Sequence, residues 1–110
     1  MVDRKLLGAG GEHLAVQILY SRGFSILEKN YHCRFGEIDV ICSRAGVIYF
    51  VEVKTRMDSR LGLPREAVNR EKQARIRRCA QWYLSHTGQR ETNCQFMVVE
   101  VTVDIIEDAF

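Results

Sequence analysis

The order of extended and helical segments constrains the fold of this chain more than any other feature. Apolar and β-branched residues mark three short extended segments in close succession, at residues 24–28, 37–42 and 47–55. A helical pattern at residues 63–85 separates them from a last extended segment at residues 95–103. Strands joined by short connections pair antiparallel, whereas a long helix between two strands implies a parallel crossover. The sequence therefore predicts a mixed four-stranded sheet.

Apolar residues recur at spacings of three, four and seven between residues 5 and 22, which predicts an amphipathic helix before the first strand. Gly23 follows as its C-cap. Gly8, Gly10 and Gly11 weaken this pattern, because each glycine inside a helix costs up to about 1 kcal/mol. Either the helix begins later than residue 5, or another part of the chain approaches its backbone closely. The resulting α-β-β-β-α-β order is an α/β fold with helices flanking the sheet.

The ends of the second helix and the nature of the last strand also follow from local patterns. Pro64 followed by Glu66 is typical of a first helical turn, so the helix is expected to begin there and to run to about Ser85. The last strand is almost continuously apolar, which predicts burial on both of its faces. With 110 residues, the chain is expected to form a single domain spanning residues 1–110.

Composition excludes several classes of protein. No apolar run approaches the roughly 20 residues of a membrane helix, and the first residues lack the apolar stretch of a secretory signal, so a cytoplasmic location is expected and no membrane partner. The cysteines show no zinc-ligand or disulfide spacing and are interpreted as reduced thiols: Cys33, Cys42, Cys79 and Cys94. Residues 1–99 carry all 16 Lys and Arg against 10 Asp and Glu, whereas residues 100–110 carry four acids and no base. A moderately basic body favours an anionic partner.

Acidic residues and a lysine lie inside strands that are otherwise apolar. If the hairpin turns on residues 45–46, opposite residues have numbers that sum to 91, which sets Asp39 against Glu52 and Glu37 against Lys54. The two carboxylates of Asp39 and Glu52 then project from one face with Cβ atoms about 4.5 to 5.5 Å apart, which is unfavourable for like charges. A cation is therefore expected between them. The alternative is a solvated strand face with a Glu37–Lys54 ion pair.

Lys54 can supply part of the missing positive charge, and a divalent ion bound through oxygen can supply the rest. Mg²⁺ is commonly held by one or two carboxylates, waters and substrate phosphate, so a phosphodiester is the natural substrate. Glu12 lies at the border of the apolar stripe of the first helix and is a candidate third acid, direct or through water; its alternative role is a solvated helix residue. In such a site Asp39 and Glu52 are metal ligands, and Lys54 stabilises charge on the reacting phosphate or orients the attacking water.

The spacing of these residues resembles the catalytic pattern of the restriction-endonuclease-like superfamily and is similar to that of archaeal Holliday-junction resolvases. A closer resemblance, covering nearly the whole chain, is to the YraN family of small bacterial proteins. The positions that carry it are Gly11, Glu12, Asn30, the run from Arg34 to Asp39, the run from Phe50 to Arg56, Gly62, residues 66–68 and Lys72. The resemblance implies an endonuclease-like αβββαβ core, with Glu12, Asp39, Glu52 and Lys54 as catalytic residues.

This resemblance implies a metal-dependent endonuclease that uses Mg²⁺ or Mn²⁺ and acts on DNA, branched or damaged DNA in particular. A lone domain of this size has little surface with which to hold two DNA arms, so a homodimer is an expected arrangement. A ribonuclease with the same site differs only in its substrate, and a nucleic-acid-binding or adaptor protein without turnover is the alternative from another class. Basic residues near the site are candidates for phosphate contact, or else form a solvated face: Arg34, Arg56, Arg60, Arg70, Lys72 and Arg75.

Overall fold

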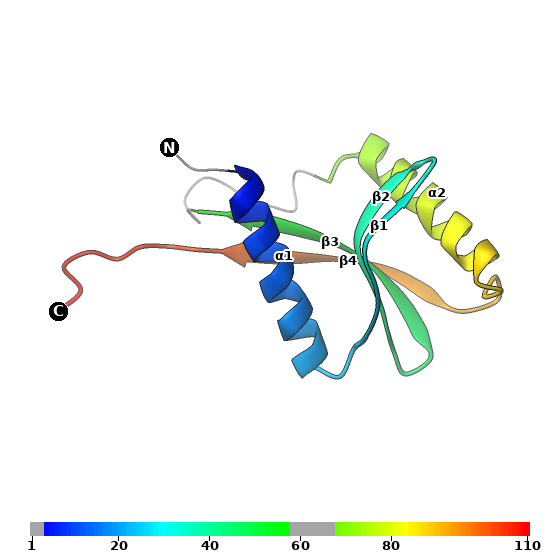
Figure 1. The fold of residues 1–110 in the computed structure, drawn as a ribbon, viewed down its shortest axis with the longest axis horizontal. Coiled ribbons are helices and arrows are strands. Elements are labelled where there is room, and N and C mark those ends of the chain that lie inside the picture. Colours follow the sequence, from blue (N-terminus) through cyan, green and yellow to red (C-terminus); the bar gives the residue numbers. More distant parts are fainter. Residues whose placement is uncertain (1–3, 58–67) are drawn as a thin grey trace.

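The computed structural model describes residues 4–57 and 68–110, and its elements follow the predicted order. They are α1 (Arg4–Ser21), β1 (Ser25–Cys33), β2 (Gly36–Arg44), β3 (Val47–Arg56), α2 (Arg70–His86) and β4 (Cys94–Thr102). The strands form one sheet in the order β1-β2-β3-β4 (Figure 1). The β1–β2 and β2–β3 pairs are antiparallel and the β3–β4 pair is parallel. The α/β class and the mixed four-stranded sheet are thus confirmed.

The two helices cover opposite faces of the sheet, and each face has its own apolar cluster. Side chains alternate between faces along a strand, so neighbouring residues of β2 and β3 divide between the clusters. The cluster under α1 contains Leu19, Phe24, Val40, Cys42 and Val51. The cluster under α2 contains Ile38, Ile41, Ile48, Phe50, Ile76, Cys79, Ala80, Tyr83 and Leu84.

The β2–β3 hairpin has the predicted register. Ala45 and Gly46 form a two-residue turn in which both have positive φ, 51° and 79°, and such turns match the twist of paired strands. Val40 lies opposite Val51, as the sum of 91 requires. The ladder of paired residues runs from the turn to this pair.

Beyond that ladder, β2 changes face. Strict alternation along the strand predicts that Ile38 shares a face with Val40. Ile38 instead packs in the α2 cluster together with Ile41, so this prediction is wrong. In the neighbouring strand β1, Asn30 has a φ of 51°, and the next residue, Tyr31, pairs with Ile38. The first strand is also longer than residues 24–28, because β1 continues through Asn30 to Cys33.

Helix α2 begins after Asn69, whose side-chain Oδ1 accepts a hydrogen bond from the backbone N–H of Lys72 at 2.9 Å. This N-cap holds the first turn of α2 in place and thereby positions Lys72 beside the sheet. The sequence predicts a helix that begins near Pro64 and runs on to about Ser85, but Val68 and Asn69 are not helical, so that start is too early for α2. The residues around Pro64 themselves lie outside the described residues.

Strand β4 is an edge strand, so the prediction that it is buried on both faces was wrong. Phe96 and Val98 are each about two-fifths exposed, whereas Val101 is buried. The continuous apolar run of this chain therefore forms a strand that is partly exposed at the surface, not one that is buried on both faces.

Helix α1 includes its glycines, and the close approach expected as one explanation occurs at Gly11. A Cβ atom built on Gly11 would collide with the side chain of Thr55 in β3, whereas one built on Gly8 or Gly10 meets no heavy atom within 4 Å in the described part of the chain. Gly11 thus lets α1 lie against β3 at the helix turn that carries Glu12. Neither α1 nor α2, the two helices within residues 4–57 and 68–110, is long and apolar enough to cross a membrane.

Candidate functional site

The candidate acidic residues meet where the paired ladder of β2 and β3 ends. The last backbone-paired residues of the two strands are Val40 and Val51. Just beyond them, the side chain of Asp39 provides the acceptor: its Oδ2 accepts a hydrogen bond from the backbone N–H of Val53 at 2.7 Å. Asp39 and Glu52 therefore stand on the two strands at this point. Burial raises the pKa of Asp39, although the Val53 hydrogen bond and the charge of Lys72 act to lower it.

Among the described residues, Glu52 is the one charged residue that is buried, with 8% of its surface exposed. Its Oε1 lies 2.6 Å from Nζ of Lys72 in α2. Burial raises the pKa of Glu52 despite this partner, and the carboxylate of Asp39 raises it further. Burial lowers the pKa of Lys72, but the bond to Glu52 outweighs it, so the net pKa of Lys72 is raised. A buried carboxylate without a partner destabilises a fold, so the ion pair with Lys72 stabilises Glu52 at its buried position.

Lys54 lies two residues beyond Glu52 in β3 and close to the same charges. Burial lowers the pKa of Lys54, and the neighbouring Lys72 ammonium lowers it further, while Glu52 and Asp39 oppose the change. The alternative of a solvated strand face expects an ion pair between Lys54 and Glu37. Glu37 instead lies 3.3 Å from Nδ1 of His32, with both side chains well exposed.

Glu12 reaches the same region from α1. It lines a cavity of about 230 Å³ together with Asp39 and Asn30, and a second cavity of about 460 Å³ together with Lys54 and Arg56. Burial raises the pKa of Glu12, as do the charge of Asp39 and a side-chain hydrogen bond to Asp39. The structure thus brings all four predicted acidic and lysine positions together from three elements.

The oxygen donors of Asp39, Glu52 and Glu12 meet some of the requirements of a hard divalent ion. Asp39 Oδ2 and Glu52 Oε1 already have hydrogen-bond partners, but each carboxylate has a second oxygen, and all three acids have raised pKa values that a cation would relieve. Within residues 4–57 and 68–110, no three His, Cys, Asp or Glu side chains are close enough together to hold an ion by themselves. The residues fit a site of two carboxylates completed by water and substrate, as is usual for Mg²⁺.

The predicted phosphate-binding residues are distributed around this region. Arg34 lies at the turn between β1 and β2, with its guanidinium 5.4 Å from the ring centre of Phe35. Arg70 and Arg75 are exposed on α2, and Arg60 lies outside the described residues. Arg56 ends β3, and its Nη1 is buried without a hydrogen-bond partner in the described structure. A buried unpaired donor is rare and marks a place where an anion would be favourable.

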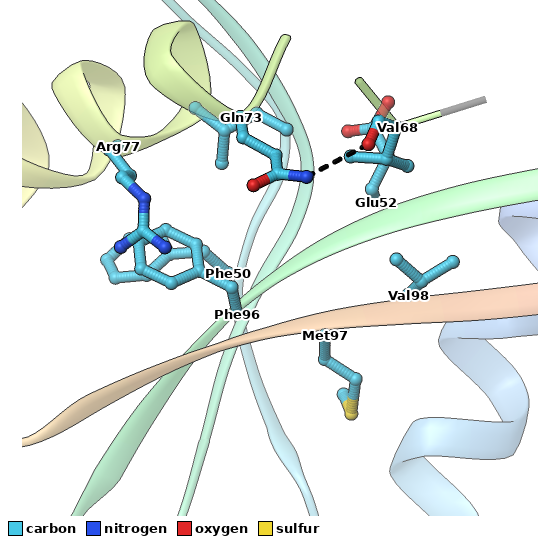
Figure 2. A pocket seen from close by; sticks show the side chains of 9 residues that line it. Phe50, Glu52, Val68, Gln73, Arg77, Phe96, Met97 and Val98 are labelled. Atoms are coloured by element: carbon cyan, nitrogen blue, oxygen red, sulfur yellow. Dashed lines mark hydrogen bonds between the residues drawn. The ribbon is translucent and has the colours of Figure 1, made fainter. Parts of the chain in front are cut away.

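An apolar cavity beside Glu52 was not predicted. It measures about 230 Å³ and lies between α2 and the exposed edge of β4, where Figure 2 shows Arg77 over the rings of Phe50 and Phe96. The Arg77 guanidinium lies 4.8 Å from the ring centre of Phe96. The sequence signal for this cavity was the apolar run of β4, which was interpreted as core.

Replacement of Asp39 by Asn is expected to stabilise the metal-free protein at neutral pH. The raised pKa means that the folded state binds protons more tightly than the unfolded state, so stability is lost as pH rises above the ordinary value of 3.8. Asn removes the charge and keeps an oxygen acceptor for Val53. We expect a melting temperature a few degrees higher at pH 7.5 in a chelator, and a difference that shrinks toward pH 4. Glu28→Gln, an exposed change on β1, is the control. A lower melting temperature for Asp39→Asn at pH 7.5 would contradict the electrostatic interpretation.

Sheet order, flanking helices and the acid and lysine arrangement together define an α/β protein with a restriction-endonuclease-like core. The chain belongs to the uncharacterised protein family UPF0102, whose family model matches residues 11–106, and the resemblance to YraN proteins is thereby confirmed. It is 41% identical to a UPF0102 protein of Caldicellulosiruptor bescii, over 99% of this chain and the whole of that protein. It is 48% identical to a UPF0102 protein of Alkaliphilus oremlandii, over 88% of this chain and 85% of that protein.

Proposed function

We propose that this protein is a metal-dependent endonuclease that hydrolyses DNA phosphodiester bonds, with branched or damaged DNA as the substrate class. One observation carries the proposal: three carboxylates with raised pKa values and two lysines converge where β2 and β3 part. Such a concentration of half-buried acids destabilises a fold unless it binds a cation. Perturbed ionisable groups of this kind cluster at functional sites.

The residues take separate roles in this proposal. Asp39 and Glu52 would hold Mg²⁺ or Mn²⁺, with Glu12 as a ligand directly or through water. The ion, when bound, neutralises charge on the scissile phosphate and lowers the pKa of a bound water. Lys54 stabilises negative charge that develops on the phosphoryl oxygens. Lys72 acts to lower the pKa of Glu52 and holds its Oε1, so the second carboxylate oxygen of Glu52 would be the one available to the ion.

Basic groups near the acids support an anionic substrate. The unpaired Nη1 of Arg56 lies in a side chain that lines the same cavity as Glu12 and Lys54, so a phosphate oxygen entering that cavity would find a donor. Arg70 and Arg75 extend the positive charge along the exposed side of α2. These basic side chains would contact the phosphate backbone of DNA, and phosphate contacts carry no information about base sequence.

Cleavage of labelled DNA tests the proposal. Four-way junction, flap, linear duplex and single-stranded DNA are incubated with Mg²⁺ or Mn²⁺ and with wild type or Lys54→Ala, and a matched RNA hairpin tests for ribonuclease activity. We expect cutting of branched DNA that depends on metal and that Lys54→Ala lowers by about 100-fold or more. Arg90→Ala, which removes an equal charge from an exposed loop position beyond α2, should cut as wild type does.

The alternative is a nucleic-acid-binding or adaptor protein that retains this fold without turnover. The Glu52–Lys72 bond favours it, because Lys72 already neutralises the most buried acid of the site. Under this alternative no substrate is cut with either metal, and junction DNA is bound with an affinity that falls steeply with salt. That pair of results would replace the nuclease proposal.

A further inference from the structure

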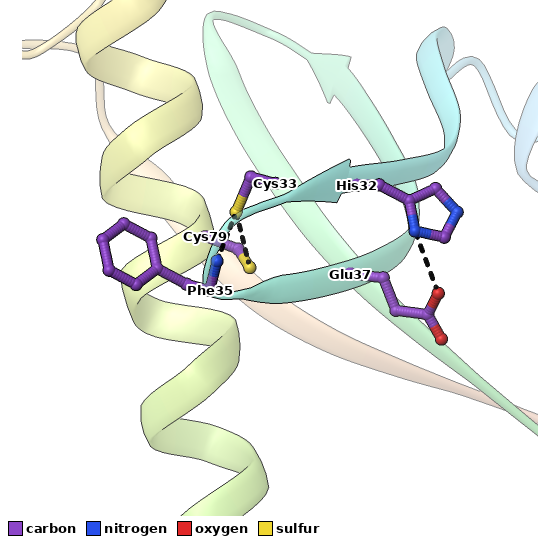
Figure 3. A network of polar contacts seen from close by, with 5 residues as sticks. All are labelled: His32, Cys33, Phe35, Glu37 and Cys79. Carbon is purple, nitrogen blue, oxygen red and sulfur yellow. Dashed lines mark hydrogen bonds and ion pairs between the residues drawn. The ribbon is translucent and has the colours of Figure 1, made fainter.

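Two thiols from different elements meet on the α2 side of the sheet. Cys33 ends β1 and Cys79 lies in α2, and their Sγ atoms are 3.1 Å apart in a thiol–thiol hydrogen bond (Figure 3). The backbone N–H of Phe35 also donates to Cys33 Sγ, at 3.4 Å, which fixes the direction of that side chain. A disulfide needs the two sulfurs about 2.05 Å apart, so a closure of about 1 Å separates the contact from a bond. We propose that Cys33 and Cys79 form an intramolecular disulfide when the protein meets a peroxide.

The surroundings of the two thiols differ in a way that orders the reaction. Cys33 lines an open cavity of about 520 Å³, together with His32, Lys72 and Arg75, so a small oxidant can reach it from solvent. Cys79 is fully buried, and burial raises its pKa to about 12. Cys33 therefore meets the oxidant and Cys79 resolves the product.

The chemistry balances with hydrogen peroxide as the oxidant. The Cys33 thiolate attacks one peroxide oxygen, the O–O bond breaks, and hydroxide leaves, which gives a sulfenic acid on Cys33. The sulfur of Cys79 then attacks the Cys33 sulfur, loses its proton, and displaces the hydroxyl group as water. In sum, two thiols lose two hydrogen atoms and one peroxide becomes two waters.

The other two cysteines lack this arrangement. Cys42 lies in the cluster under α1, on the opposite face of the sheet, and Cys94 is exposed at the start of β4. The disulfide would fasten the tip of the β1–β2 hairpin to α2. It stands on this geometry alone and does not depend on nuclease activity.

The test uses the full chain carrying Cys94→Ser, which removes the exposed thiol that would link two molecules. After hydrogen peroxide treatment, the protein is denatured, alkylated with iodoacetamide and digested without reductant. Before alkylation, we expect an intact mass about 2 Da below that of the reduced protein. After alkylation and digestion, we expect one peptide pair joined through Cys33 and Cys79, which dithiothreitol separates. Full alkylation of both cysteines, or over-oxidation of Cys33 with Cys79 still alkylated, would overturn the proposal.

Two further variants in the same background show which residues are needed. Cys33→Ser, at a partly exposed position, should leave Cys79 fully alkylated, whereas Cys42→Ala should keep the cross-link. Hydrogen exchange of residues 31–37 should be slower in the oxidised protein than in the reduced protein. Equal exchange in the two forms would show that the bond does not fasten the hairpin tip.

Discussion

Replacing Glu52 by Gln is expected to lower metal-dependent DNA cleavage by about 1,000-fold or more while the protein stays folded. Gln has nearly the shape of Glu and keeps an oxygen acceptor for Lys72, so the packing around β3 is retained. It lacks the charge that the proposed ion requires, and removal of one element of a preorganised electrostatic site commonly costs two to three orders of magnitude or more. Cleavage rates on four-way junction DNA at saturating metal provide the measurement.

Two companion measurements separate loss of metal binding from loss of folding. Mg²⁺ should raise the melting temperature of the wild type, and this rise should vanish in Glu52→Gln, since an ion that binds the folded state stabilises it by mass action. Glu28→Gln, a charge-matched change on the exposed part of β1, should keep both the cleavage rate and the Mg²⁺ effect. If Glu52→Gln cuts junction DNA at the wild-type rate, Glu52 is not a ligand and the proposed site is wrong.

Gly11→Ala should be the most destabilising single-methyl change in α1. The added Cβ would collide with the Oγ1 of Thr55 and lie 3.0 Å from its Cβ and 3.1 Å from its Cγ2. Thr is β-branched and held in β3, so it cannot turn all three atoms away. Overpacking of this kind costs about 1–3 kcal/mol, more than the helix gains from Ala. Urea denaturation would show this as a lower midpoint at an unchanged slope.

Gly10→Ala is the matched control, one residue away in the same helix. Its Cβ would meet no heavy atom within 4 Å in the described structure, so helix propensity alone acts and the variant should gain about 0.5–1 kcal/mol. Opposite signs at neighbouring positions would establish the close contact of α1 with β3. If Gly11→Ala were also stabilising, the packing that brings Glu12 to the site would be incorrect.

The fold was predictable because it depends on local patterns. Period-two alternation and a two-residue turn fix which residues of β2 and β3 oppose each other from the turn to the Val40–Val51 pair, and Asp39 and Glu52 lie one residue beyond the end of that ladder. The face change at Ile38 was not predictable, since the alternation of apolar residues does not reveal where a strand departs from it. The exposed edge at β4 was missed because an apolar run does not distinguish a central strand from an edge strand.

The contacts between α2 and the sheet could not be predicted from the sequence for a different reason. The bond between Lys72 and Glu52, and the contact between Cys33 and Cys79, depend on where α2 packs against the sheet. Spacing along the chain carries no information about that placement. The sequence predicts Lys72 as a phosphate contact, and its carboxylate partner Glu52 in the structure was not expected.

The hydrogen bond from Val53 to Asp39 makes one backbone amide a reporter of the site. An amide that donates to a carboxylate has a strongly shifted proton resonance, and that shift follows the charge of the acceptor. The Val53 cross-peak in a ¹⁵N-labelled sample therefore reads the ionisation of Asp39 directly, in the native sequence and without a substrate. Titration with acid at zero metal would give the response of this resonance to protonation, and titration with Mg²⁺ at fixed pH would give its response to an ion, so the two events are followed separately at a single atom.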